Sequence, residues 1–416
     1  MTGRRRARSR APRGRSRVGE RWTVRTDRIG HGGFVVARHE GVVVFVRHAL
    51  PGEVVVAEVT EGQDGDRFLR ADAVEVLEPS PDRVQPPCPF AGPGRCGGCD
   101  LQHAALPAQR RWKAAVVTEQ LQRLAGLDVE VVVEAVPGDR DGLDWRTRVQ
   151  WAVSPDGTPG LRRHRSHDLE LVDRCLIAHP DLPDVLGTQW PDAVSVESIV
   201  SSAGDRLRLV ATRDRSTYAD GPLVLHETAA GRDWQVSGSG FWQVHPGAAD
   251  ILVDAVLGAL RPEPGERVLD LYAGVGLFSA ALADAVGPTG HVLAVEGDAG
   301  ATDDAAANLA DLPQATVLTD RVDRALAGLA TDHAVDLVVL DPPRTGAKRE
   351  VVEAIAAQGP RAVAYVACDP AALARDVAFF AEHGYSLAGI RAFDLFPMTH
   401  HVECVALLTR IGSDLR

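Results

Sequence analysis

The C-terminal part of the chain alternates between two hydrophobic patterns. From Glu266 onward, short runs of β-branched and aliphatic residues alternate with alanine-rich segments of helical character. The strand-like runs lie at 267–272, 291–296, 315–319, 335–341, 361–367, 385–393 and 402–408, and helical segments separate all but the last two. Such alternation predicts an α/β fold in which helices wrap a largely parallel, seven-stranded sheet.

The N-terminal part has a different pattern. From about Arg21 to Leu77, short β segments such as 34–37 and 42–46 are separated by glycine turns, which predicts a small β-barrel. A helix is predicted over 108–124, with Gly126 as its stop.

These patterns divide the chain into four parts. Residues 128–240 mix strand-like runs and loops and are the least informative stretch. We expect an Arg-rich disordered tail at 1–17, a barrel at 18–79, a cysteine-containing, mixed α+β region at 80–240 and the α/β domain at 241–416.

Composition and charge limit the classes of function. Of the 416 residues, 45% are hydrophobic and 25% charged, and no run approaches the roughly 18 apolar residues of a membrane span. No apolar segment follows the basic N-terminus as it would in a signal peptide, so we expect a cytoplasmic protein without membrane contact. A monomer is the simplest expectation.

The net charge of −12 conceals an asymmetry. Residues 1–17 contain eight Arg and no acidic residue, which leaves 37 basic against 57 acidic residues elsewhere. This balance argues against nucleic-acid binding over the whole surface, so any RNA contact must be local. The tail suits phosphate contacts, but a disordered leader without function explains it equally well.

Cys368 ends the apolar run 362–367 and is followed by Asp369 and Pro370. A buried strand that stops at a cysteine places a thiol at the carboxyl edge of the sheet, where open α/β folds carry out chemistry. The alternative is that Cys368 is a small buried hydrophobic residue.

A glycine turn follows the first strand of the α/β domain. In 270–278, Gly274 and Gly276 let a ligand approach the backbone closely, and Glu296 ends the next strand, where an acid can bind ribose hydroxyls. Ser279 stands where a dinucleotide-binding motif has its third glycine. A nucleoside cofactor without pyrophosphate is therefore favoured, and S-adenosylmethionine is the commonest.

The segment Asp341-Pro342-Pro343-Arg344-Thr345-Gly346 closes another apolar strand. Two prolines stiffen this loop and suit a wall against a planar base. Methyltransferases that act on exocyclic amines have an aromatic residue after the prolines. Arg344 occupies that position here, which favours a target other than an amine.

Cys368 and Glu403 together suit one reaction. A thiolate that adds to carbon 6 of a pyrimidine makes carbon 5 nucleophilic enough to take a methyl group. A carboxylate then removes the carbon 5 proton so that the thiol can leave. Glu403 is the candidate base, and we expect the neighbouring Cys404 to be a core residue.

At these residues the chain resembles the class I methyltransferases that make 5-methyluridine in transfer and ribosomal RNA. The matching segments are 239–244, 270–278, 341–346, 365–370 and 399–403. The resemblance implies a Rossmann-like methyltransferase domain, with Cys368 as nucleophile and Glu403 as base. It implies a cofactor and base pocket lined by Gln243, Tyr272, Glu296 and Asp341, with Asp320 a weaker candidate. Leu277 departs from the polar residue that many relatives carry there.

The remaining cysteines fit the same resemblance. Cys88, Cys96 and Cys99, with Cys175 at a distance, provide four thiolates for an iron–sulfur cluster or zinc. Several family members hold a [4Fe–4S] cluster on such a set, so we expect this cluster rather than zinc. The barrel resembles the TRAM module, which implies RNA binding, although a purely structural cap remains possible.

Three other functions share some of these sequence features. A radical methylating enzyme leaves one cluster iron open, whereas Cys175 would close this cluster. In cytosine-5 methyltransferases the nucleophile normally follows a proline, but Cys368 precedes Asp369-Pro370. A non-catalytic RNA-binding iron–sulfur protein would not need Cys368, Glu403 and the glycine turn together. The RNA, either transfer RNA or 23S ribosomal RNA, and the modified uridine are not specified by the sequence.

Overall fold

The computed structural model describes residues 14–329 and 335–412, and it divides into two compact units. The first unit ends at Arg95 and also contains Cys99–Ala105, whereas the second contains Cys96–Gly98 and continues from Leu106. Most of the expected tail, residues 1–13, lies outside the described residues. Arg17, also assigned to the tail, donates its backbone N–H to the Gly62 carbonyl at 3.1 Å.

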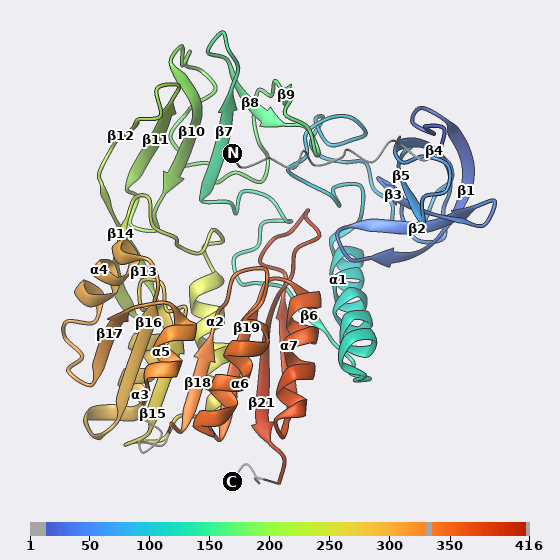
Figure 1. The fold of residues 1–416 in the computed structure, drawn as a ribbon. Helices are drawn as coiled ribbons and strands as arrows, with labels where there is room; N and C mark the ends of the chain where they lie inside the picture. Colours follow the sequence, from blue (N-terminus) through green and yellow to red (C-terminus); the bar gives the residue numbers. More distant parts are fainter. Residues whose placement is uncertain (1–13, 330–334, 413–416) are drawn as a thin grey trace, which may run out of the picture. The chain divides into compact units, whose positions relative to one another are not determined.

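The first unit is built around a closed five-stranded barrel, as the sequence predicts (Figure 1). Alternate residues of β2 face the barrel interior. Val35 and Ala37 are at most 1% exposed, whereas Phe34 and Val36, which alternate with them, are partly exposed. The strands, joined in the order β1-β2-β3-β5-β4, are β1 (Arg21–Gly30), β2 (Phe34–His39), β3 (Val42–Arg47), β4 (Val54–Glu61) and β5 (Phe68–Glu78).

The second unit includes the helix predicted from the sequence. Helix α1 (Leu106–Gln120) continues into a π-helical turn, η1 (Leu121–Ala125). Gly126 ends it with a left-handed φ of 69° and donates its N–H to the Gln122 carbonyl at 3.1 Å. This is the conformation in which glycine caps a helix without a steric penalty.

Residues 128–240, where the sequence predicts mixed strands and loops, include two antiparallel sheets. One is a six-stranded sheet of β12 (Thr217–Asp220), β11 (Arg206–Thr212), β10 (Ala193–Val200), β7 (Arg148–Val153), β8 (Pro159–Arg162) and β9 (Leu169–Glu170), in that order. The other is a hairpin of β13 (Val224–Ala229) and β14 (Arg232–Ser237).

The α/β domain contains the seven predicted strands and one more. In the sheet order β17-β16-β15-β18-β19-β21-β20-β6, the first five are parallel and β21 runs antiparallel to both neighbours. The strands are β15 (Arg267–Leu271), β16 (His291–Glu296), β17 (Ala315–Thr319), β18 (Leu337–Leu340), β19 (Ala362–Ala367), β20 (Tyr385–Phe393) and β21 (Glu403–Arg410). The additional edge strand is β6 (Val133–Glu134), which pairs with β20.

Helices pack on both faces of this sheet (Figure 1). Successive strand residues belong to opposite hydrophobic clusters: Val339 and Ala364 face the cluster of α2 (Ala248–Leu260) and α3 (Leu277–Val286), whereas Val338 faces the other. The second hydrophobic cluster includes residues of α5 (Val322–Gly328), α6 (Lys348–Gln358) and α7 (Pro370–Glu382). Two further helical segments of the domain are η2 (Gly287–Thr289) and α4 (Ala299–Asn308). Burial on both faces explains why β18 and β19 are apolar throughout.

None of the described helices has the length and apolar character needed to cross a membrane.

Candidate active site

The turn after β15 has an unusual backbone. Tyr272, Gly274 and Gly276 have φ values of 63°, 55° and 92°. A left-handed conformation is common for glycine but uncommon and costly for tyrosine, and such residues concentrate at functional sites. A Cβ placed on Gly274 would meet no heavy atom within 4 Å. The turn therefore leaves open space against the backbone, as the predicted cofactor site requires.

Glu296 lies against this turn. Its Oε2 accepts the Gly274 N–H at 3.0 Å, and its Oε1 accepts the N–H groups of Gly297 at 2.6 Å and Asp298 at 2.9 Å. Asp320, at the end of the neighbouring β17, donates its N–H to the Glu296 carbonyl at 3.0 Å. The structure thus brings Gly274, Glu296 and Asp320 together at the carboxyl edge of the sheet.

Ser279, which replaces the third glycine of a dinucleotide motif, has a partner in β15. Its Oγ donates to Asp270 Oδ2 at 2.6 Å, and Asp270 is only 1% exposed. Burial raises the pKa of Asp270 to about 7. Burial, followed by the charge of Asp270, also raises the pKa of Asp341, at the end of β18, to about 7. Asp270 was not singled out from the sequence.

The strand register brings Cys368 to Glu403. In the antiparallel pair of β19 and β21, Ala367 lies opposite Cys404, so the next step of the register places Cys368 opposite Glu403. Directly opposed residues in an antiparallel pair project from the same face, with Cβ atoms about 4.5–5.5 Å apart. Glu403 is 5% exposed, so it is not a solvated strand end. Cys404 is fully buried, as expected for a core residue.

The electrostatics of this site link residues from three strand ends. Burial, then the charges of Glu403 and Asp341, raise the pKa of Cys368 to about 11, while Arg344 opposes the shift. Burial, then Asp341, raise the pKa of Glu403 well above its ordinary value, and Arg344 again opposes. Within the part of the chain that the structure describes, Arg344 is the cation whose charge opposes both shifts. From the sequence, Arg344 was notable only because it stands where methyltransferases that act on amines have an aromatic residue; its electrostatic effect on Cys368 and Glu403 comes from the structure.

The loop that carries Arg344 is fixed by buried groups that the sequence analysis missed. Asp376 on α7 is fully buried, and its Oδ2 accepts the Ala347 N–H and the Tyr365 hydroxyl, each at 2.7 Å. The Arg375 guanidinium donates to the Thr345 carbonyl at 2.7 Å. These bonds connect the loop to β19 and α7, the two elements on either side of Cys368. The sequence pattern does not reveal these hydrogen bonds, because they depend on how α7 packs against the loop and β19.

Gln243 and Tyr272 complete the predicted pocket residues. Gln243 follows β14, and α4 connects this region to the glycine turn: Asn308 Nδ2 donates to the Gln235 carbonyl at 3.0 Å and to the Val275 carbonyl at 3.1 Å. Gln243 itself lines a cavity next to Trp242. Burial raises the pKa of Tyr272 to about 12, so its hydroxyl is protonated and can act as a donor.

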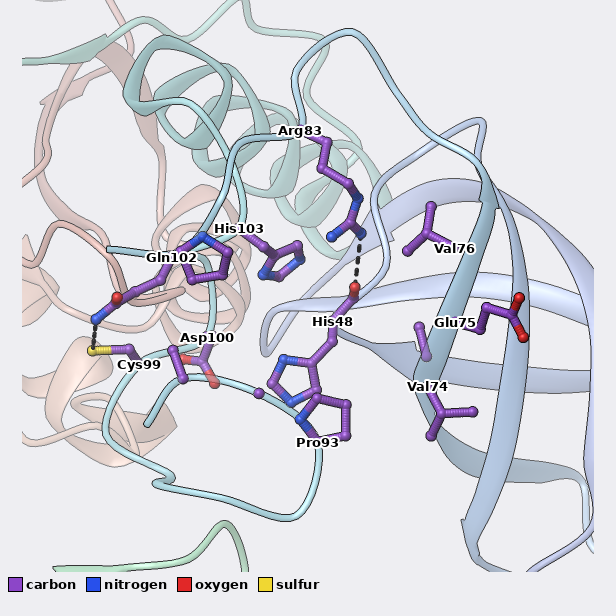
Figure 2. A pocket seen from close by; sticks show the side chains of 14 residues that line it. His48, Val74, Glu75, Val76, Arg83, Pro93, Cys99, Asp100, Gln102 and His103 are labelled. Atoms are coloured by element: carbon purple, nitrogen blue, oxygen red, sulfur yellow. Dashed lines mark hydrogen bonds between the residues drawn. The ribbon is translucent and has the colours of Figure 1, made fainter. Parts of the chain in front are cut away.

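The cysteines expected to hold a metal fall in both units. Cys88 and Cys99 belong to the first, Cys96 and Cys175 to the second. Gln102 connects the first two: its Oε1 accepts the Cys88 N–H at 3.1 Å, and its Nε2 donates to Cys99 Sγ at 3.2 Å (Figure 2). No disulfide joins any of the six cysteines, all of which lie within the described residues. Within residues 14–329 and 335–412, no group of three or more His, Cys, Asp or Glu is arranged to hold a metal ion.

Cys99 also lines a small cavity of the first unit, of about 160 Å³, beside β5 (Figure 2). Arg83 crosses this cavity and donates to the His48 carbonyl at 2.8 Å. Burial lowers the pKa of His103, another lining residue, to about 4, so it is neutral at physiological pH. None of the predicted catalytic or cofactor residues lies here.

Comparisons with known proteins show the family of the chain. The family model described as tRNA (uracil-5-)-methyltransferase matches residues 240–411, and that of the TRAM domain matches residues 15–74. An RNA methyltransferase of Streptomyces coelicolor is 48% identical over 96% of this chain and 95% of its own length. Another, from Bifidobacterium longum, is 42% identical over 93% of this chain and 96% of its own length.

A solved structure shares the fold. The tRNA (uracil-54, C5)-methyltransferase of Pyrococcus abyssi, in complex with S-adenosyl-L-homocysteine, matches 94% of this chain and 100% of its own, with a TM-score of 0.68. Sequence identity between the two is 20%. The barrel and the α/β sheet are therefore a shared architecture.

Proposed function

Because the chain belongs to the S-adenosylmethionine-dependent RNA (uracil-5-)-methyltransferase family, we propose that it methylates carbon 5 of one uridine in structured RNA through a covalent cysteine adduct. The observation that supports this proposal is the register of β19 and β21, which pairs Ala367 with Cys404, so that Cys368 and Glu403 are the next residues at the same end of the pair. Neither residue alone performs the reaction, and both lie at the carboxyl edge of the sheet beside Asp341.

Cys368 and Glu403 act at successive steps of the proposed reaction. The Cys368 thiolate bonds to carbon 6 of the uracil, and the electron pair of the 5,6 double bond moves toward carbon 5. After methylation, the Glu403 carboxylate takes the carbon 5 proton, the sulfur–carbon 6 bond breaks, and the double bond and the thiolate return. A raised pKa makes Glu403 a stronger base than an exposed glutamate, which suits this step.

The cofactor residues are those of the glycine turn and its neighbours. We propose that Gly274 and Gly276 give access to the backbone, that Glu296 and Asp320 hold the ribose and base, and that Gln243, Tyr272 and Asp341 line the methyl end. When bound, S-adenosylmethionine supplies a methyl group on a positively charged sulfur. The buried carboxyls of Asp341 and Glu403 favour a cation there, because both become more easily ionised beside a positive charge.

The target base must leave its stack before it reaches Cys368. Extrusion of a base costs a few kcal/mol, which RNA contacts elsewhere have to offset. We propose that the barrel contributes these contacts and that the substrate is transfer or 23S ribosomal RNA. The basic tail is a further candidate, although residues 1–13 lie outside the described residues. The cytoplasmic location and monomeric state expected from the sequence are part of this proposal.

A [4Fe–4S] cluster on Cys88, Cys96, Cys99 and Cys175 is also proposed, in preference to zinc. The hydrogen bond from Gln102 Nε2 to Cys99 Sγ supports a thiolate ligand at that position, because donors to sulfur stabilise cluster thiolates. The methyl transfer moves no electron to or from a metal, so the proposed role of the cluster is structural.

The function is tested with RNA from cells that lack the gene. The purified enzyme, incubated with this RNA and methyl-labelled S-adenosylmethionine, should form 5-methyluridine at one position, located by nuclease digestion and mass spectrometry. Cys368→Ala should reduce transfer by about 10⁴-fold or more, as removal of a catalytic nucleophile does. Cys404→Ala, which removes the adjacent buried thiol, is the matched control and should keep most activity.

Glu403→Gln should stop the reaction at a later step than Cys368→Ala, namely the removal of the carbon 5 proton after methylation. Without the base, the methylated adduct accumulates as a protein–RNA band that survives a denaturing gel, and Cys368→Ala/Glu403→Gln should give no band. Methyl transfer that persists in Cys368→Ala would overturn the covalent mechanism. Formation of 5-methylcytidine in place of 5-methyluridine would overturn the choice of base.

A further inference from the structure

The second unit contains a cavity that the proposed reaction does not use. It has a volume of about 490 Å³ and lies among the loop between β10 and β11, strand β13 and the start of α2. Its lining includes Ser201, Ser202, Arg206, Glu227, Trp242 and Gln243. The volume is in the range of small-molecule sites. Gln243, one of the proposed cofactor residues, is among the residues that line the cavity.

Two acidic residues line this cavity, and Glu227 is the buried one, whereas the Asp181 side chain is exposed. Glu227 is 6% exposed, and its Oε2 accepts the Ser202 N–H at 2.8 Å. The Ser202 Oγ in turn accepts the Thr228 N–H at 2.7 Å. The carboxylate is therefore held in one orientation by the loop that it faces. Because a carboxylate has about four acceptor positions, it can still accept hydrogen bonds from a ligand.

The cavity also has a cation at its rim and an aromatic wall. Arg206 begins β11, and its Nη2 lies 3.2 Å from Asp181 Oδ1 in a pair that is more than half exposed. Exposed pairs of this kind contribute little free energy, so a phosphate can compete for the guanidinium. Trp242 is partly buried, with its ring centroid 5.9 Å from that of Trp234. An aromatic face of this type stacks on a nucleobase.

These groups together match one class of ligand. We infer that the cavity binds a second, unpaired nucleotide of the RNA substrate, one whose base carries an exocyclic amino group. Trp242 stacks on the base, Glu227 accepts the amino N–H, and Arg206 contacts the phosphate. RNA is read mainly through bases splayed out of the helix, by stacking and by hydrogen bonds to their edges. Glutamate is a natural acceptor for an amino group such as that of cytosine. The inference rests on the proposed function, because it requires RNA to be the substrate.

The test measures methyl transfer to total RNA from cells that lack the gene. We expect Glu227→Gln and Arg206→Ala each to raise the RNA concentration at half-maximal rate about tenfold, the usual scale for one lost base or phosphate contact. The S-adenosylmethionine concentration at half-maximal rate should not change. Arg208→Ala is the matched control: Arg208 lies on the same strand and is paired with Asp220 at 2.7 Å, but it does not line the cavity.

Glu227→Gln also separates a base from a phosphate as the ligand. The amide replaces an acceptor by a donor, so recognition of an amino group weakens. If the cavity held phosphate alone, loss of a negative charge would instead strengthen RNA binding and lower the half-maximal concentration. That result would overturn the inference, as would Arg206→Ala and Glu227→Gln variants that behave like Arg208→Ala. Circular dichroism and thermal unfolding establish that the variants are folded.

The ligand position can then be located in a short RNA spanning the mapped uridine. Bases near the target are removed one at a time, and each abasic RNA is assayed with the wild type and with Glu227→Gln. At one position the loss should be about tenfold larger with the wild type than with Glu227→Gln, because the variant has already lost the hydrogen bond and the abasic RNA then removes only the stacking on Trp242. If each abasic RNA lost the same factor in activity with Glu227→Gln as with the wild type, the inference would be contradicted. If the wild-type enzyme methylates no RNA, it is the proposed function that fails.

Discussion

Cys368 lies in surroundings that suppress its reactivity in the free protein. Burial and the charges of Glu403 and Asp341 disfavour the thiolate, whereas Arg344 and a backbone hydrogen bond favour it less strongly. The proposed reaction needs the thiolate, so substrates must change this balance. A positively charged cofactor beside Asp341 and Glu403 would do so, since it offsets the negative charges that raise the pKa of the thiol.

The pH dependence of thiol alkylation tests this description. With a pKa raised to about 11, the Cys368 thiol is almost fully protonated at pH 7, and the thiolate fraction grows with pH. Alkylation by iodoacetamide should therefore rise roughly tenfold per pH unit between pH 7 and pH 10. Peptide mass spectrometry follows the residue, and buried Cys404 should stay unmodified. A rate that levels off near pH 8 would contradict the raised pKa.

Among the elements, α1 supports the loop that leads to Glu403. Lys113 Nζ lies 2.5 Å from Asp394 Oδ1 and donates to the Phe396 carbonyl at 3.0 Å. Gln109 Oε1 accepts the Met398 N–H at 2.9 Å. Lys113 and Asp394 are 2% and 1% exposed, so the pair is almost completely removed from water. The start of β21, and with it Glu403, depends on these contacts.

Lys113→Met should lower the free energy of unfolding by about 3–5 kcal/mol, because the buried Asp394 carboxylate loses its nearer cation, while Arg110 Nη1 lies 3.9 Å from Asp394 Oδ2, beyond hydrogen-bond distance. Urea denaturation measures the loss. Lys113→Met/Asp394→Leu, which removes both charges, should recover most of the stability. If the single variant loses less than about 1 kcal/mol, the pair is not a principal support of the loop.

At the scale of the whole molecule, charge is distributed unevenly. The chain is acidic overall, with a net charge of −12, although its function requires RNA, which is an anion. Binding must then depend on local groups rather than on a general positive potential. The contacts that we propose are those of the barrel, of Glu227 and Arg206 in their cavity, and of the active-site edge.

Metal analysis tests the proposed [4Fe–4S] cluster. Protein purified without oxygen should contain about four iron and four sulfide per chain and absorb broadly in the visible range. Cys99→Ser should lose most of this iron, whereas Cys404→Ala should retain it. One zinc per chain and no iron would favour the alternative metal and contradict the cluster.

The sequence by itself determined the outline of the fold and the candidate chemistry. The seven strands of the α/β domain, the barrel and the helix ending at Gly126 follow from hydrophobic periodicity and turn residues, which are local properties. Cys368, Glu296 and Asp341 were recognisable because each ends a strand whose apolar run can be seen in the sequence.

Only the tertiary structure decided which of these residues meet. The register of β19 against β21 places Cys368 opposite Glu403, and that pairing joins segments 35 residues apart by reversing β21 in the sheet. The Asp376 contacts and the cavity of Glu227 likewise depend on packing between distant elements. Local periodicity contains no information on such contacts, because burial and hydrogen bonding between separate elements arise only when the chain is folded.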